Sequence, residues 1–185
     1  AGFLSVRHFY FQPREVKAQA AMYKGEIYFA KDSFELALKG NGADFVGFEA
    51  IADDYSSTKA GNLAAAYAGI CYYNLGKDAE ALAYLKKFDG DDAFLSPNIE
   101  AMIGNCYANM DQYDDAIKAF EKAAKKADNE MASPIFLQKA ATVAEKMGNY
   151  KKALDFYQKI KDEYSQSMIG RDIDKYIERA KAHVK

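Results

Sequence analysis

The chain has 185 residues, enough for one domain with a continuous hydrophobic core. Its formal net charge of -2 argues against a surface that follows nucleic-acid phosphates, so we expect no nucleic-acid partner. Two cysteines are too few for a disulfide framework or a zinc site, and the motifs of common catalytic and nucleotide-binding sites do not occur in the sequence. We therefore expect a non-enzymatic protein that holds no cofactor and no metal ion.

The first thirteen residues, AGFLSVRHFYFQP, differ from the rest of the chain. Residues 1–6 are largely apolar, and an aromatic run at residues 9–11 precedes Pro13 and a charged stretch. This order is typical of the exit of a transmembrane helix, although six residues are far fewer than the roughly 20 that span a bilayer. We interpret residues 1–13 as the remnant of a membrane anchor or a flexible arm. The alternative is an apolar segment that docks on the following helices or on a neighbouring copy.

A first helix is predicted from Arg14 to about residue 31, because its apolar residues recur every three or four positions. A second helix restarts at residues 32–38, with Asp32 or Ser33 as its N-cap. Together they form a first, degenerate repeat. The apolar residues of the first helix are Val16, Ala20, Tyr23, Ile27 and Ala30.

The second helix of this repeat is interrupted by a strong turn signal, KGNG at residues 39–42. A new apolar run follows and ends in IADDYSST at residues 51–58, which closely matches IKDEYSQS at residues 160–167. Counted from the alanine that recurs in each repeat, this matching segment begins about seven residues later in the first repeat than in the last. The first repeat therefore carries about seven extra residues, around Gly40 to Gly47. Insertions at one site of a repeat array are often functional, but terminal repeats also vary because they cap the array. We favour the capping explanation.

The clearest repeat unit is NLAAAYAGICYYNLGKDAEALAYLKKF at residues 62–88. Its first helix carries small residues, including Gly69, and stops at Gly76. In the second helix Ala81 and Leu85 share one face, which packs back against the first helix. A pair of short helices cannot bury that face alone, so one copy implies neighbouring copies.

Further copies follow, since Ala81, Ala116 and Ala153 are separated by 35 and then 37 residues. In the third repeat Asp111 stands where Gly76 ends the helix, an exchange that left-handed backbone tolerates. We expect repeats at residues 14–58, 62–95, 97–130 and 134–167, and one capping helix at residues 168–185 within a solenoid at residues 14–185.

The two cysteines, Cys71 and Cys106, occupy the same place in successive repeats. Neighbouring helix axes in a packed array lie about 8–10 Å apart, and like helices lie further apart, beyond the reach of a disulfide. We expect two free, buried thiols that behave as small hydrophobic groups.

The acidic cluster at residues 89–92, with Glu100 after it, has part of the spacing of a calcium-binding loop. Ala93 and Phe94 stand where that loop needs a ligand and a glycine. We interpret the cluster as a turn between repeats that caps the following helix.

The repeat signature at residues 14–167 resembles the tetratricopeptide repeat (TPR) family, whose typical period is about 34 residues. The resemblance implies an all-α fold, a right-handed superhelical α-solenoid of about four TPR helix pairs with a C-terminal capping helix. The apolar stretch before Pro13, the first repeat YFAKDSFELAL and the insertion GNGADFVGF resemble bacterial envelope TPR proteins with an N-terminal membrane anchor. That group includes the YfgM-like ancillary subunits of the Sec translocon, which bind periplasmic chaperones. It implies an inner-membrane-anchored protein with a periplasmic solenoid.

The resemblance also predicts a concave groove lined by the first helix of each repeat. TPR domains that bind acidic chaperone C-termini use a clamp of Lys, Arg and Asn, and here only Asn105 with Lys139 or Lys146 could serve. An uncharged groove suits an extended peptide or a partner helix better. Alternatively, the groove holds only water or the chain's own N-terminal helix. The predicted groove residues are Leu63, Ala66, Ile70, Tyr73 and Asn74, then Asn98, Ala101, Asn105, Ala108 and Asn109, and finally Ile135, Gln138, Thr142, Glu145 and Lys146.

We therefore expect a non-catalytic scaffold for protein or peptide partners, in the form of a membrane-tethered, extracytoplasmic adaptor. The alternative is a soluble TPR module that forms homo-oligomers through its aromatic N-terminal segment. A run of about 14 or more apolar residues directly before Ala1 is required by the first hypothesis and not by the second.

Overall fold

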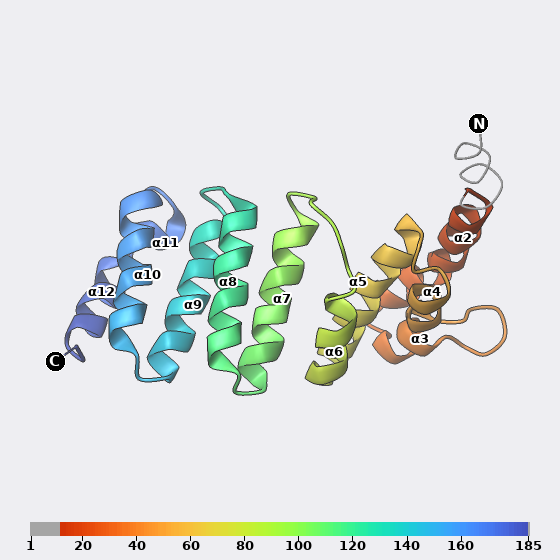
Figure 1. The fold of residues 1–185 in the computed structure, drawn as a ribbon, viewed down its shortest axis with the longest axis horizontal. Helices are drawn as coiled ribbons and strands as arrows, with labels where there is room; N and C mark the ends of the chain where they lie inside the picture. The colour runs from red at the N-terminus through yellow and green to blue at the C-terminus, as the bar shows by residue number, and fades with distance from the viewer. Residues whose placement is uncertain (1–11, 185) are drawn as a thin grey trace. The chain divides into compact units, whose positions relative to one another are not determined.

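Antiparallel helix pairs build the whole of the computed structural model, which describes residues 12–184 (Figure 1). No β-strand occurs in that range, so the predicted all-α class is confirmed. None of the helices in residues 12–184 is both long enough and apolar enough to cross a membrane. The chain divides into two compact units at residues 1–89 and 90–185, which are described separately.

In the first unit, two short helices replace the second helix of the first repeat. Both follow the long helix α2, and α3 packs against α2 and α5 while α4 packs mainly against α5. The last two helices form the second repeat. The helices are α2 (Gln12–Phe29), α3 (Phe34–Lys39), α4 (Phe48–Asp54), α5 (Lys59–Asn74) and α6 (Asp78–Leu85).

In the second unit, consecutive helices pack side by side in chain order (Figure 1). The first four make two helix pairs, and the last helix packs on α10. The helices are α7 (Leu95–Asn109), α8 (Tyr113–Ala127), α9 (Ser133–Lys146), α10 (Tyr150–Glu163), α11 (Met168–Arg171) and α12 (Asp174–Lys181).

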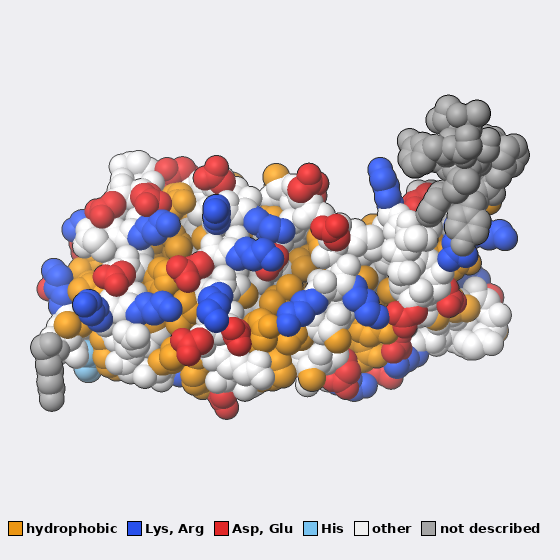
Figure 2. Space-filling model, viewed as in Figure 1, with side chains coloured by type: hydrophobic (Ala, Val, Ile, Leu, Met, Phe, Trp, Pro, Cys, Tyr) orange, Lys and Arg blue, Asp and Glu red, His pale blue; other side chains and the backbone are white. Residues whose placement is uncertain are grey.

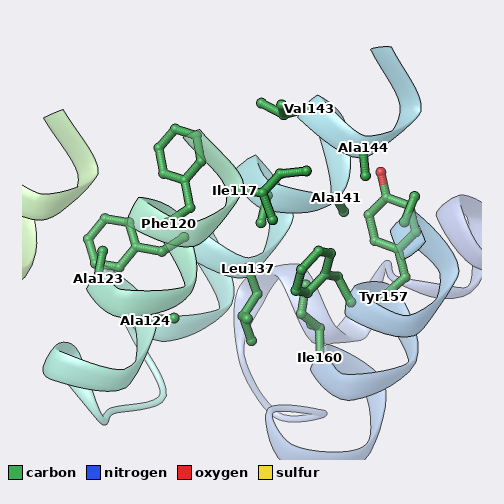
Figure 3. Close-up of a cluster of buried hydrophobic side chains, with 14 of the residues drawn as sticks. Ile117, Phe120, Ala123, Ala124, Leu137, Ala141, Val143, Ala144, Tyr157 and Ile160 are labelled. Atoms are coloured by element: carbon green, nitrogen blue, oxygen red, sulfur yellow. The ribbon is translucent and has the colours of Figure 1, made fainter. Parts of the chain in front are cut away.

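The core of the second unit combines large side chains with alanines (Figure 3). Tyr157 from α10 is completely buried and lies beside Ala141 and Ala144 from α9. Because these alanines bring little volume, the tyrosine ring can approach the backbone of α9 closely. Phe120 from α8 and Ile160 from α10 extend the same cluster.

The turn inside each helix pair has the same backbone conformation four times. Asp32, Gly76, Asp111 and Gly148 have φ angles of 55°, 71°, 59° and 74°, all in the left-handed region. The next residue donates its N–H to the carbonyl five positions earlier, at 2.8–2.9 Å in every case, which closes the helix in a Schellman arrangement. The prediction that Asp111 takes the place of the turn glycine in left-handed backbone is confirmed. Asp32 gives the degenerate first repeat the same turn.

The matching sequences at residues 51–58 and 160–167 form the same structure. Thr58 caps α5 by accepting a hydrogen bond from the Gly61 N–H at 2.9 Å, and its hydroxyl donates to the Tyr55 carbonyl at 2.7 Å. Ser167 makes the equivalent two bonds, to the Gly170 N–H at 2.9 Å and the Tyr164 carbonyl at 2.7 Å. These two hydrogen bonds, made by one hydroxyl, define a recurring clip between a second helix and the helix that follows it.

The insertion forms a loop at residues 40–47 that folds around Asn41. The Asn41 side-chain oxygen accepts hydrogen bonds from three successive N–H groups, those of Ala43, Asp44 and Phe45, at 3.0–3.1 Å. Phe45 is buried, and its ring centroid lies 5.9 Å from that of Tyr28 on α2. The insertion loop therefore packs back onto the first helix.

The final segment differs from the single helix predicted at residues 168–185. It is interrupted between α11 and α12, where the N–H groups of Asp172 and Ile173 donate to carbonyls three residues earlier, at 3.2 and 3.3 Å. Such bonds tighten the chain beyond an α-helix and end α11 after one turn. The segment still packs inward along one apolar side, since Ile173, Ile177 and Ala180 are all buried.

The first helix also differs from its sequence pattern. Its buried face consists of Ala18, Met22 and Gly25. The periodic apolar residues that predict the helix lie on the opposite side, where Val16 is 64% and Tyr23 is 66% exposed. The pattern correctly indicates a helix, but α2 has two apolar faces and the more prominent one is in solvent.

Both thiols are free and buried, as predicted. Burial raises the pKa of the Cys71 thiol to about 12, so its reactive thiolate is scarce near neutral pH. We expect a disulfide reagent that titrates thiols to react with neither cysteine in the native protein at pH 8, and with both in guanidinium chloride. Fast reaction of a native thiol, followed by absorbance, would contradict this burial.

Candidate functional site

Four of the predicted groove positions meet at one hollow in the second unit. The hollow has a volume of about 200 Å³ and lies on α7, α8 and α9. It is lined by Asn105, Ala108, Phe120, Gln138, Lys139, Thr142 and Val143. The first helices of the third and fourth repeats therefore do form a shared concave surface.

Lys139 is the central polar group of this hollow. Its Nζ donates a hydrogen bond to Asn105 Oδ1 at 3.0 Å and lies 5.6 Å from the centroid of the Phe120 ring. Both contacts favour a cation, but neither partner carries a full negative charge. Burial lowers the pKa of Lys139, since the half-buried ammonium has lost part of its hydration. An incoming carbonyl or carboxylate oxygen would restore that solvation.

The amide groups beside Lys139 can serve a peptide backbone. Asn105 uses its oxygen for Lys139, and an amide also carries two N–H donors. Gln138 is half-buried in the wall of the hollow. The Thr142 hydroxyl already donates to the Gln138 carbonyl at 2.9 Å, so Thr142 contributes mainly its methyl group and shape. The site thus offers amide donors, one cation and an aromatic face.

The other predicted lysine, Lys146, belongs to a different cluster. Its Nζ lies 4.8 Å from the Tyr113 ring centroid and 3.6 Å from an Asp111 carboxylate oxygen. Glu145, also predicted for the groove, forms an ion pair with Arg179 at 2.7 Å. Of the two lysines considered for the groove, the structure therefore brings only Lys139 to Asn105.

The predicted groove residues of the first unit have a different setting. Only Leu63 lines the hollow between α2 and α5, which has a volume of about 240 Å³. Glu15 in that hollow accepts hydrogen bonds from the backbone N–H groups of Lys59 and Ala60, at 2.7 and 3.2 Å. Its carboxylate is therefore used to cap α5. Ile70 and Tyr73 are half-buried, and Asn74 is exposed and bonds the Ile70 carbonyl at 2.8 Å.

Two predicted groove residues are packing positions instead. Ala66 is 1% exposed and Ala101 is 6% exposed, so neither side chain offers a surface to a partner. Asn98 and Asn109 are exposed at the two ends of α7, and Asn98 donates to the Phe94 carbonyl at 2.6 Å. The expectation that every predicted groove position reaches the groove surface is therefore wrong for Ala66 and Ala101.

Sequence reasoning underestimated Phe120 and Lys139. Phe120 is absent from the predicted groove residues, but its ring forms part of the hollow. Repeat register aligns Asn105 with Thr142, and Lys139 lies three residues, or about one helical turn, before that position. The sequence feature that could have identified Lys139 was therefore a lysine one helical turn before the position that aligns with Asn105.

The acidic cluster before α7 caps that helix, as predicted. Asp92 Oδ1 accepts hydrogen bonds from the N–H groups of Phe94 and Leu95 at 2.8 and 2.7 Å. Glu100 turns to Lys122 and forms an ion pair at 2.5 Å. Within residues 12–184 no three His, Cys, Asp or Glu side chains are grouped so that they could hold a metal ion.

Repeated helix pairs, left-handed intrapair turns and a hollow on the first helices define a protein of the helical-repeat class. The sequence model of the tetratricopeptide repeat matches residues 67–89, 101–130 and 137–167. The chain therefore contains tetratricopeptide repeats, and these matches fall on the second, third and fourth helix pairs. Comparison with curated proteins gives no match.

Proposed function

We propose that the chain is a non-catalytic scaffold whose second unit binds an extended segment of a partner protein in the hollow around Lys139. The observation that carries the proposal is the half-buried ammonium, which lines the hollow and contacts an amide oxygen and an aromatic face. Tetratricopeptide repeats support a protein partner in general.

The surface charge also favours a protein partner over nucleic acid. On the face shown in Figure 2, Lys and Arg side chains are interspersed with Asp and Glu side chains over the second unit. Binding to a phosphate backbone needs a basic stripe instead. A surface of mixed charge is compatible with a peptide partner.

Selection of peptides from a random phage-displayed library on the immobilised full chain tests this proposal. We expect an enriched peptide whose dissociation constant rises about ten-fold or more in Asn105→Leu and in Lys139→Met, because each variant removes a polar group while keeping similar volume. Lys118→Met is the matched control, since Lys118 is an exposed lysine on α8 outside the hollow. Failure to enrich a peptide, or equal affinity in both hollow variants, would refute the proposed site.

A finer proposal concerns location. We infer an inner-membrane-anchored, extracytoplasmic adaptor from the resemblance of residues 1–13 and of the first repeat to bacterial envelope TPR proteins. Residues 1–11 lie outside the described part of the chain, as does most of the segment proposed for self-association in the alternative. An apolar run encoded directly before Ala1 is the expected result, and a polar sequence there would favour the soluble alternative.

A further inference from the structure

The outer face of α2 carries an apolar stripe that no described element of the first unit covers. Val16, Tyr23 and Ile27 are 64%, 66% and 39% exposed, and Ala20 is exposed between them. These four residues, which we call the α2 stripe, follow one another at spacings of four, three and four. That spacing is the heptad pattern of a two-helix seam. The buried face of α2, at Ala18, Met22 and Gly25, lies on the opposite side of the helix.

We propose that the α2 stripe is a dimerisation surface, on which α2 of a second copy of this chain packs in parallel. The stripe points away from the body of the unit because it lies opposite the buried face. Two units can therefore meet at α2 with their cores on opposite sides. The inference is independent of the peptide site proposed in the second unit.

The charges beside the stripe favour a parallel over an antiparallel pair of α2 helices. Lysines lie along one flank of the stripe, at Lys17 and Lys24 on α2 and at Lys31 in the turn that follows it, seven residues apart. Amides and one carboxylate lie along the other flank, at Gln12, Gln19 and Glu26, also seven residues apart. In a parallel pair each residue of the second flank faces the residue five positions later on the other chain, so Glu26 meets a lysine. An antiparallel pair related by two-fold symmetry would place lysines against lysines.

The shape of the surface supports the same arrangement. In parallel helix pairing, the partner's Tyr23 inserts among Ala20, Tyr23, Lys24 and Ile27. Three of these residues, Ala20, Tyr23 and Lys24, line a hollow of about 180 Å³ on this side of α2. The insertion loop forms its far wall, with Val46 57% exposed and Asp44 paired with Lys24. The loop therefore widens the site that receives the tyrosine.

Sedimentation velocity over a concentration series of the full chain tests the proposal. We expect a reversible monomer-dimer equilibrium, because the α2 stripe is short and supplies only about two heptads. Tyr23→Asp should weaken dimerisation at least about thirty-fold, since it places a charge in a buried layer on both chains. Phe94→Asp is the matched control, because Phe94 is 83% exposed but lies in the second unit. A monomer at all concentrations, or a Tyr23→Asp dimer of unchanged strength, would overturn the proposal.

Two further variants test whether the α2 helices pack in parallel and whether α2, rather than the N-terminal aromatic segment, forms the dimer contact. Val16→Cys should form an intermolecular disulfide under mild oxidation, because parallel packing puts residue 16 next to the partner's residue 16. Antiparallel packing would instead set Val16 against the partner's Ile27, and a dimer without that disulfide would refute the parallel arrangement. Phe9→Ser/Phe11→Ser should leave the dissociation constant unchanged. If that double variant abolishes the dimer, the N-terminal aromatic segment rather than the α2 stripe holds it together.

Discussion

Replacing Gly61 by alanine is expected to lower the free energy of unfolding by about 3 kcal/mol or more, although it adds a single methyl group. A Cβ atom at Gly61 would lie 1.9 Å from the Tyr55 carbonyl oxygen and 2.4 Å from its carbon. Both are backbone atoms, so no side-chain rotation can relieve the overlap. The Thr58 hydroxyl holds this carbonyl near Gly61, because it donates to the Tyr55 carbonyl oxygen and accepts from the Gly61 N–H.

Gly76→Ala is the matched control for this prediction. Gly76 has a φ angle of 71°, which alanine adopts at a cost of about 1–2 kcal/mol, but no atom lies within 4 Å of the added Cβ. Urea denaturation followed by circular dichroism should rank Gly61→Ala as clearly the less stable variant. Gly170→Ala should behave like Gly61→Ala, because its Cβ would lie 2.0 Å from the Tyr164 carbonyl oxygen. Equal stability of Gly61→Ala and the wild type would disprove this geometry of the clip.

Gly104→Ala is expected to destabilise the second unit by about 1–3 kcal/mol, and Phe120→Leu should recover part of that loss. The added Cβ would lie 2.8–3.0 Å from three atoms of the Phe120 ring, and these are its nearest neighbours. Because the overlap involves one side chain only, a smaller side chain at residue 120 removes it. The double-mutant cycle should therefore show a coupling free energy of about 1 kcal/mol or more.

Gly69 provides the contrast for that cycle. A Cβ at Gly69 would meet the Leu85 side chain at 2.6 Å but also the Leu85 backbone nitrogen at 2.9 Å. Truncation by Leu85→Ala should therefore rescue Gly69→Ala less completely than Phe120→Leu rescues Gly104→Ala. If the effects of Gly104→Ala and Phe120→Leu are additive, the added methyl group does not press on the Phe120 ring. The proposed contact would then be wrong.

Local signals in the sequence were sufficient to predict the fold class and the repeat register. The alanines at 81, 116 and 153 are all completely buried, and the aspartate at 111 does adopt the left-handed turn. These features are set within one helix pair, where spacing and backbone conformation leave few alternatives. The break at Asp172 was missed because hydrogen bonds to carbonyls three residues earlier have no marker in composition.

The candidate site was predicted only in part. Asn105, Gln138 and Thr142 were correctly brought to one surface by the repeat register. Ala66 and Ala101 share that register but are buried, because a small side chain does not extend beyond its larger neighbours. Which face of α2 is buried could not be predicted either, since both faces are apolar and the choice depends on tertiary packing around Met22.

The clip at Thr58 and Ser167 has a consequence for how such a chain can grow. Helix α11 begins after Ser167 with the same cap, the same carbonyl and the same close glycine as α5 after Thr58. A gene segment that encodes residues 59–167 therefore starts and stops at interchangeable joints. Its tandem duplication would lengthen the array without creating a new junction, so this protein carries in its own sequence a ready unit for adding repeats.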